Sequence, residues 1–142
     1  MQKRILFFDD EDWSIEPYSE KLRDHGIEPE LAVNGKEAID RLQKNRYDLL
    51  VLDIMLQSEN TIGNEPRRAG ATLLQMIRQN EIPDMKTATD VPVVILTAVT
   101  DEKLLSEVKS WNVSNIFRKP FAFTEVTDTL LKLVQSDRME QK

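Results

Sequence analysis

The sequence predicts an α/β fold in which helices cover both faces of a doubly wound parallel sheet. Three observations predict it: short apolar runs alternate with amphipathic stretches along the chain, the central runs lack polar residues, and the length of 142 residues suits one domain. The composition agrees with this class. The absence of cysteine excludes disulfides and thiolate metal sites, and a single histidine excludes a multi-histidine zinc site.

Five short runs have the composition of β-strands, because they are apolar or rich in β-branched residues. Each run is separated from the next by a helical pattern, and this alternation indicates parallel pairing with right-handed crossovers. The five runs are Ile5–Phe8, Leu31–Val33, Leu49–Leu52, Val91–Leu96 and Asn115–Arg118.

Five other stretches repeat apolar residues at helical spacing. Pro17 must lie in the first turn of the first helix, which ends near Gly26. Asn34–Gly35 signals the turn before the second helix, and Asn112 suits a left-handed cap after the fourth. The apolar positions are Ile15, Tyr18 and Leu22, then Ala38, Ile39 and Leu42, then Leu73, Leu74 and Ile77, then Leu104, Val108 and Trp111, and finally Phe123, Val126, Leu130 and Leu133.

We expect a single domain over residues 1–142, with a core from about 3 to 134 and a polar tail, 135–142, that frays. A cytoplasmic protein is predicted, because no signal-peptide or membrane-spanning pattern is visible. The net charge of −6 argues against direct binding to nucleic acid or to anionic membranes.

Polar residues follow four of the five predicted strands at their carboxyl ends. Asp9 and Asp10 follow the first run, Asp53 the third, Thr97 the fourth and Lys119 the fifth. In a doubly wound sheet these ends meet at one edge, where ligands bind. An ionised Asp53 directly after an apolar strand is costly unless it is paired or binds a metal.

The charges of these residues point to a divalent cation. Asp9, Asp10 and Asp53 carry −3 and Lys119 carries +1, so one divalent ion would balance them. Carboxylate oxygens favour Mg²⁺ or Mn²⁺ over zinc. Because phosphoryl transfer depends mainly on positioning and charge neutralisation, a carboxylate beside a metal ion and a lysine is a suitable phosphoryl acceptor.

At these residues the sequence resembles the receiver domain of two-component response regulators. The matching segments occur in family order and cover the chain from Lys3 to about Val134. They are Ile5–Asp10, Ala32–Ala38, Leu49–Met55, Val91–Ala98 and Arg118–Phe121. The resemblance implies a flavodoxin-like fold, a five-stranded parallel sheet in the order 2-1-3-4-5 with five helices.

The resemblance implies a phosphorylation-activated signalling switch and not an enzyme in the usual sense. Asp53 would accept a phosphoryl group from a phosphohistidine on a sensor histidine kinase or a histidine phosphotransfer protein. Asp10, Asp53 and the backbone carbonyl of Met55 would hold Mg²⁺ or Mn²⁺. Asp9 would act mainly through water or by orienting the residues that bind the metal. A dimer that forms on phosphorylation is a further expectation.

The resemblance assigns the response to phosphorylation to Thr97 and Lys119, which would read the phosphoryl group and transmit its arrival. An aromatic switch residue usually lies three positions before the lysine in this family. Here Ile116 occupies that position, and the alternation of a strand places the neighbouring Phe117 on the opposite face.

The connection after Asp53 departs from the family. The segment Ile54–Gly70 has 17 residues, more than a usual connection between strand and helix, and we expect its part from Gln57 onward to be a surface insertion that influences partner choice. Met55 and Val99 are apolar and occupy the positions that border the path of an attacking water in receivers. They predict slow self-dephosphorylation, because neither can orient a water.

Two other functions are open from the sequence. A phosphatase of the haloacid-dehalogenase type also combines an aspartate nucleophile, threonine, lysine and Mg²⁺, but its usual second aspartate is replaced here by Met55. A receiver-like module that binds partners without phosphorylation is disfavoured by the intact set of aspartates, threonine and lysine. The switch is therefore the leading hypothesis.

Overall fold

The structure, a computed structural model, describes residues 2–11, 13–54, 69–98 and 102–140. Five parallel strands form one sheet in the order β2-β1-β3-β4-β5, which confirms the predicted fold class. The elements are β1 (Lys3–Phe8), α1 (Glu16–Asp24), β2 (Ile27–Ala32), α2 (Gly35–Lys44), β3 (Leu49–Asp53), α3 (Ala69–Arg78), β4 (Val93–Thr97), α4 (Glu102–Lys109), β5 (Asn115–Arg118) and α5 (Phe123–Glu140).

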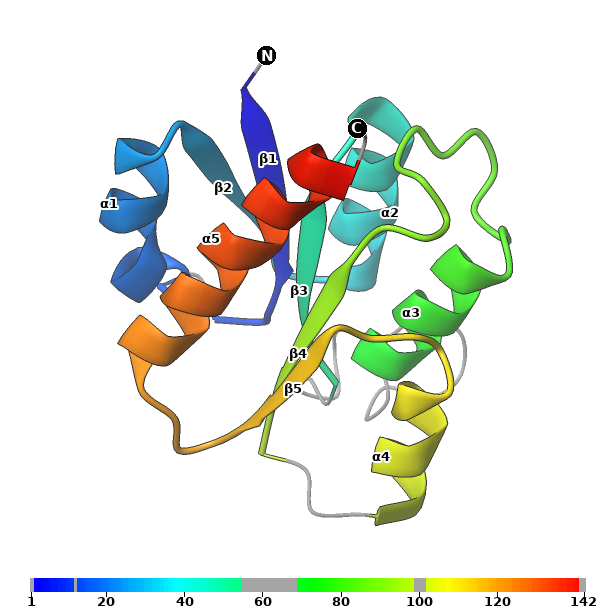
Figure 1. The fold of residues 1–142 in the computed structure, drawn as a ribbon. Helices are drawn as coiled ribbons and strands as arrows, with labels where there is room; N and C mark the ends of the chain where they lie inside the picture. The colour runs from blue at the N-terminus through cyan, green and yellow to red at the C-terminus, as the bar shows by residue number, and fades with distance from the viewer. Residues whose placement is uncertain (1, 12, 55–68, 99–101, 141–142) are drawn as a thin grey trace.

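Helices cover both faces of the sheet (Figure 1). Helices α1 and α5 lie on one face, and α2, α3 and α4 lie on the other. Successive side chains of β3 alternate between the two sides: Leu49 and Val51 pack toward α1 and α5, whereas Leu50 and Leu52 pack toward the other three helices. The strand is buried on both faces, which explains its continuous apolar sequence.

The second strand is longer than the sequence predicts. It spans Ile27–Ala32 instead of Leu31–Val33 and pairs with β1 along its whole length. Pro29 and two neighbouring glutamates obscure it in the sequence. They are tolerated because β2 is an edge strand, the position in a sheet where proline is compatible with pairing.

The other strand boundaries agree with the sequence predictions within one or two residues. Pro17 lies in the first turn of α1, and Asn112 has a left-handed backbone with a φ of 62° after α4. Trp111, which the sequence places in the fourth helix, lies in the turn that follows α4, and α5 extends to Glu140, into the segment expected to fray. Within the described ranges, every helix is too short or too polar to cross a membrane.

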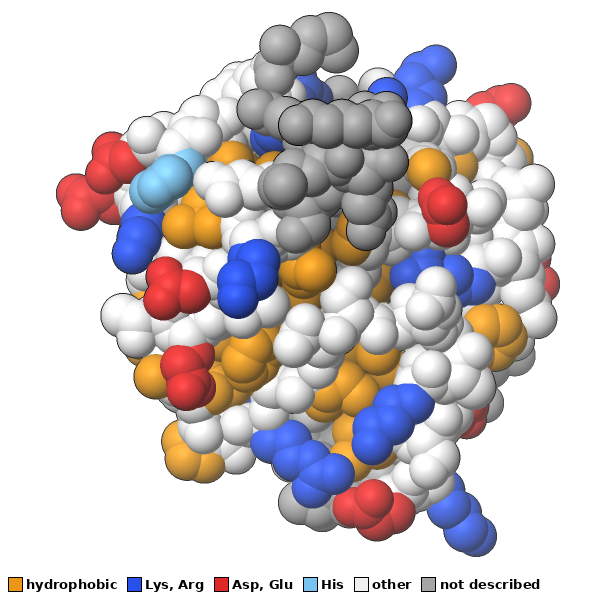
Figure 2. Space-filling view, viewed as in Figure 1, with side chains coloured by type: hydrophobic (Ala, Val, Ile, Leu, Met, Phe, Trp, Pro, Cys, Tyr) orange, Lys and Arg blue, Asp and Glu red, His pale blue; other side chains and the backbone are white. Residues whose placement is uncertain are grey.

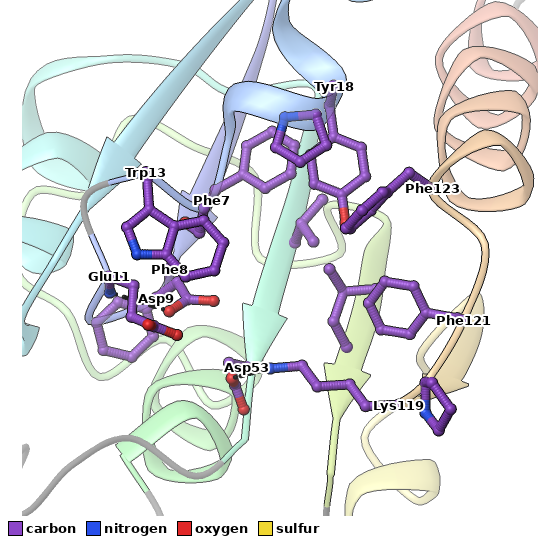
Figure 3. Close-up of a pocket in the computed structure, with 15 residues that line it drawn as sticks. Phe7, Phe8, Asp9, Glu11, Trp13, Tyr18, Asp53, Lys119, Phe121 and Phe123 are labelled. Carbon is purple, nitrogen blue, oxygen red and sulfur yellow. Dashed lines mark hydrogen bonds and ion pairs between the residues drawn. The ribbon is translucent and has the colours of Figure 1, made fainter.

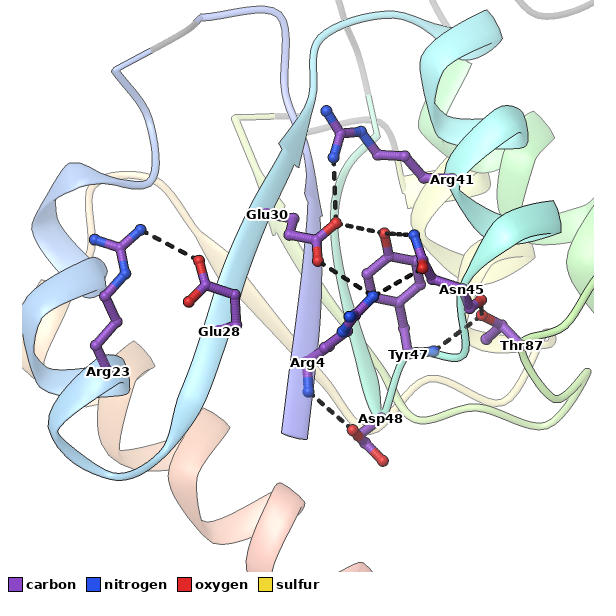
Figure 4. A network of polar contacts seen from close by, with 9 residues as sticks. All are labelled: Arg4, Arg23, Glu28, Glu30, Arg41, Asn45, Tyr47, Asp48 and Thr87. Carbon is purple, nitrogen blue, oxygen red and sulfur yellow. Dashed lines mark hydrogen bonds and ion pairs between the residues drawn. The ribbon is translucent and has the colours of Figure 1, made fainter. Parts of the chain in front are cut away.

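A polar network fixes the α3–β4 connection, residues 79–92, to the edge of the sheet (Figure 4). The buried Tyr47 donates its hydroxyl hydrogen to Glu30 Oε1 at 2.7 Å, and Arg41 pairs with the same oxygen at 3.2 Å. The backbone N–H of Tyr47 donates to Thr87 Oγ1 at 3.0 Å, and this hydroxyl donates to the carbonyl of Asn45 at 2.9 Å. Thr87 therefore joins the connection to the segment before β3.

We expect the hydroxyl of Thr87 to matter more for stability than that of Tyr47. The Thr87→Val change leaves the N–H of Tyr47 and the carbonyl of Asn45 without this partner, and should lower the free energy of unfolding by about 2–3 kcal/mol. The Tyr47→Phe change leaves Glu30 paired with arginine and should cost about 1 kcal/mol. Urea denaturation measures both. Thr87→Ser, which keeps the hydroxyl, is the control, and equal losses in the two test variants would contradict the ranking.

Candidate functional site

The acidic residues gather at the carboxyl ends of β1 and β3. Asp53 is the last residue of β3, and Asp9 follows β1 directly. The two strands are paired neighbours, and their register places Asp9 and Asp53 at the same level of the sheet. One side-chain oxygen from each of Asp9, Asp10 and Glu11 lies within 4.8 Å of the others. The strand order therefore joins residues that are more than forty positions apart in the sequence.

Asp53 forms an ion pair with Lys119, which follows β5 and reaches across β4 (Figure 3). Lys119 Nζ donates to Asp53 Oδ2 at 3.2 Å, and the Asp53 side chain is only 10% exposed. Partial burial by itself lowers the pKa of Lys119, but the charge of Asp53 and the hydrogen bond to it outweigh burial and raise the pKa above its ordinary value. The lysine therefore stays cationic and balances the carboxylate that the strand buries.

Thr97 is a further polar residue at this edge of the sheet, and its strand lies between those that lead to Asp53 and Lys119. It is the last residue of β4 and is fully buried. Because β4 pairs with β3 on one side and with β5 on the other, Thr97 lies between the strands that lead to Asp53 and Lys119. Its carbonyl accepts a hydrogen bond from the backbone N–H of Lys119 at 2.7 Å. The polar residues that the sequence places after four strands thus occupy one edge of the sheet.

Asp9 has a perturbed acid–base equilibrium. Burial raises its pKa from 3.8 to about 6, and the charges of Asp53 and Asp10 act in the same direction. A hydrogen bond from the backbone N–H of Glu11 and the charge of Lys119 partly oppose this shift. Ionised Asp9 is therefore unfavourable in the folded protein unless a cation approaches it.

The donor set fits Mg²⁺ or Mn²⁺. Its side chains offer carboxylate oxygens, which are hard donors, and they carry more negative charge than Lys119 alone neutralises. Glu11 belongs to this cluster, although the sequence reasoning did not assign it a role. Met55, whose carbonyl the resemblance assigns to the metal site, lies outside the described residues, as do Val99 and positions 57–68 of the expected insertion.

The two apolar residues of β5 point to opposite faces of the sheet, as the sequence predicts. Ile116 packs toward the side of α2, α3 and α4. Phe117 lies on the other side and contacts Phe121, with ring centroids 6.2 Å apart. The aromatic residue of this strand therefore cannot replace the missing aromatic side chain at position 116 without reversing the strand.

Gly70 is a site residue that the sequence reasoning missed. The sequence predicts Gly70 in the connection after Asp53, but it lies in α3. A Cβ at this position would overlap the backbone carbonyl of Asp53 and would lie 2.8 Å from Ile54 Cα, and the N–H of Gly70 donates to the carbonyl of Ile54 at 3.0 Å. Helix α3 thus packs directly on the backbone that carries Asp53. In the sequence, a glycine next to a helical pattern, where it lowers helix propensity, is the one signal of this close approach.

Comparison with known proteins gives one consistent family. The family model described as the response regulator receiver domain matches residues 5–131. The transcriptional regulatory protein CrdR of Helicobacter pylori is 29% identical over 140 residues, which are 99% of this chain and 59% of CrdR. The chain spans about half the length of the curated relatives that it matches.

Solved structures agree in fold. The receiver domain of the Francisella response regulator 1452 superposes with a TM-score of 0.72 at 25% identity, covering 96% of this chain and 99% of that one. The response regulator TrrA of Thermotoga maritima, solved in complex with Mg²⁺–BeF, has a TM-score of 0.67 at 30% identity, covering 93% of this chain and 99% of that one.

We expect Asp9→Asn to stabilise the metal-free protein at neutral pH. Since the folded pKa is raised, the folded state loses stability as the pH rises from about 4 to about 6, and the full cost of ionised Asp9 is present above that range. One pKa unit corresponds to about 1.4 kcal/mol; after a discount for solvent screening, we expect a gain of about 1–2 kcal/mol at pH 7.5. Urea denaturation in EDTA measures it.

The gain from Asp9→Asn should disappear at pH 4, where aspartate is protonated in the folded protein. Glu20→Gln, which removes one negative charge from an exposed position of α1, is the control for overall charge. A gain of equal size at pH 4 and pH 7.5, or in the control, would show that ionisation of Asp9 is not its cause.

We expect Gly70→Ala to disturb Asp53 as well as the fold. The added methyl group must displace the backbone at Asp53 and Ile54, which should cost about 1–3 kcal/mol. The backbone amide shifts of Asp53 and Ile54 in ¹⁵N NMR spectra should change. Gly26→Ala is the matched control, because Gly26 has a φ of 76° but no atom within 4 Å of an added Cβ, so its substitution strains only the local backbone. Unchanged shifts in Gly70→Ala would refute the contact.

Proposed function

Because this chain belongs to the response regulator receiver domain family, we propose that it is a phosphorylation-operated switch in which Asp53 is the phosphoryl acceptor. One observation carries this proposal. Asp53 is a buried carboxylate at the end of a central strand, hydrogen-bonded to Lys119 and adjacent to the acidic residues that follow β1. This combination supplies a nucleophile, a fixed cation and oxygen donors for a metal ion.

The proposed phosphoryl donor is a phosphohistidine on a sensor histidine kinase or a histidine phosphotransfer protein. A carboxylate oxygen of Asp53 attacks the phosphorus, a P–O bond forms as the P–N bond breaks, and the imidazole leaves with a proton taken from solvent. Lys119 neutralises negative charge on the phosphoryl oxygens. Thr97 offers a hydroxyl group at the same edge of the sheet, and we assign to it the reading of the phosphorylated state.

We assign the metal site to Asp10 and Asp53 with the carbonyl of Met55, and we place Asp9 as a residue that acts through water. When bound, Mg²⁺ or Mn²⁺ would supply positive charge to the phosphoryl oxygens. The support is the set of carboxylate oxygens at this edge and the similarity to TrrA, whose structure contains Mg²⁺–BeF.

Loss of the phosphoryl group is proposed to be slow. Met55 and Val99 are apolar, so neither would orient a water for attack on the acyl phosphate. We further propose that the signal leaves through Thr97 with Ile116 as an aliphatic switch residue, toward an output domain or a dimer of phosphorylated receivers. The relatives of greater length, with names such as transcriptional regulatory protein, support an output segment in the complete protein.

The test is labelling with acetyl phosphate and Mg²⁺, followed by mass spectrometry. We expect one added phosphoryl group that hydroxylamine removes, no labelling of Asp53→Asn, and labelling of Lys119→Ala at least about tenfold slower, since it lacks the neutralising cation. Asp40→Asn, at a lysine-paired surface position of α2, is the matched control and should label normally. Decay of the labelled protein measures the proposed slow hydrolysis. Undiminished labelling of Asp53→Asn would exclude Asp53 as the acceptor.

A further inference from the structure

A cavity of about 300 Å³ lies beside Asp53 on the face of the sheet that α1 and α5 cover (Figure 3). Ten of the fifteen side chains that line it are apolar or aromatic. Phe7, Val51 and Leu96 from three strands form its inner surface, and Tyr18 from α1 and Phe123 from α5 form its sides. A concave apolar cavity of this size, with a few polar groups at one end, is typical of a small-molecule site.

The aromatic rim of this cavity is open to solvent. Trp13 is 57% exposed and Phe123 is 50% exposed, and these are the large hydrophobic side chains that the described ranges leave most exposed. Tyr18 stacks on Phe7 at 5.3 Å between ring centroids and meets the edge of Phe123 at 5.6 Å. Figure 2 shows hydrophobic side chains at the surface around the start of α5. Covering this aromatic surface with a ligand would remove apolar area from water.

The other end of the cavity is acidic. Asp9, Glu11, Asp53 and Lys119 line it, three carboxylates and one ammonium, with a net charge of −2. Asp53 is paired with Lys119 at 3.2 Å, whereas Asp9 and Glu11 have no ion pair within the part of the chain that the structure describes. The uncompensated charge favours a cationic group in the ligand and disfavours an anionic one.

Ser14 adds an independent sign of a ligand. It lines the cavity, and its Oγ is buried without a hydrogen-bond partner in the described residues. Buried hydroxyl groups are normally satisfied, because an unmade hydrogen bond costs free energy. A ligand with N–H groups would give this oxygen a donor.

We propose that this cavity binds a small organic cation, an arylalkyl ammonium. Its ring lies among Tyr18, Phe123 and Trp13, and its ammonium group lies near Asp9 and Glu11, within reach of Ser14. The aromatic faces also attract the positive charge of the ligand. Because the ammonium group and the metal ion draw on the same carboxylate of Asp9, the ligand opposes Mg²⁺ binding and therefore phosphorylation. This last consequence rests on the function proposed above, whereas binding in the absence of metal does not.

Three probes share a phenyl ring and a four-carbon chain and differ in the charge of their end group: 4-phenylbutylamine, 4-phenylbutanol and 4-phenylbutyrate. Comparing them distinguishes the contribution of charge to binding from that of apolar contact. Binding is measured by calorimetry in low salt with EDTA, and by the fluorescence of Trp13. We expect the amine to bind at least about tenfold more tightly than the carboxylate, with the alcohol between them, and the spread to shrink in 0.5 M salt. Equal affinity of the three probes, or no binding of the amine, would overturn the proposal.

Variants locate the site. Phe123→Ala and Trp13→Ala each remove exposed apolar surface and should weaken all three probes several-fold, while Asp9→Asn should selectively weaken the amine. Val113→Ala, which trims a side chain packed against the opposite face, is the matched control and should bind normally. Unchanged binding in both aromatic variants would overturn the assignment to this cavity.

Competition with Mg²⁺ tests the regulatory consequence. Addition of 10 mM Mg²⁺ should weaken the amine at least about fivefold and leave the alcohol nearly unchanged, since only the amine needs the negative charge. An amine that binds equally well with and without Mg²⁺ would overturn the opposition between ligand and metal. Failure of acetyl phosphate to label Asp53 would refute the proposed function but would not alter binding in EDTA, so the two failures are distinguishable.

Discussion

The ion pair between Lys119 Nζ and Asp53 Oδ2, at 3.2 Å, is the interaction on which the rest of the site depends. A carboxylate that is only 10% exposed is costly to ionise without a nearby cation. The pair forms only because β4 separates β3 from β5 and lets the lysine reach over one strand. Strand order thus decides which charges meet. The residues next to Asp53 or Lys119 in the sequence do not indicate that these two side chains pair.

The site combines a rigid support with unfavourable charge. Gly70 lets α3 lie directly on the backbone of Asp53 and Ile54, and Thr97 is held in a fully buried position. Against this support, the burial and charge that raise the pKa of Asp9 make its ionised form unfavourable without a nearby cation. A cation at this edge would relieve that cost, which links cation binding to stability. The same unfavourable charge makes both a metal ion and an organic ammonium suitable ligands, and it sets them in competition.

Hydrogen bonds from Arg78 fix the elements at the end of the molecule opposite the site. Arg78, at the end of α3, donates to the carbonyls of Trp111, Thr89 and Asn112 at 2.8, 2.7 and 2.9 Å. These bonds tie the turn after α4 and the α3–β4 connection to α3. Within the residues that the structure describes, Arg78 makes no such bond to the carboxyl ends of β4 and β5, where Lys119 bonds to the backbone of Thr97. We therefore expect any response to the phosphorylation proposed above to be confined to that end.

The sequence by itself determined the fold class, the five strands and the residues at the carboxyl ends, because strands buried on both faces are apolar throughout and end in polar residues that must be paired. It indicated only the last part of β2, because an edge strand tolerates Pro29. Only the tertiary structure decided that Gly70 touches the backbone of Asp53 and that an aromatic cavity opens beside the site. Both features arise where elements distant in sequence pack together, and the sequence of one element alone does not indicate how closely another approaches it.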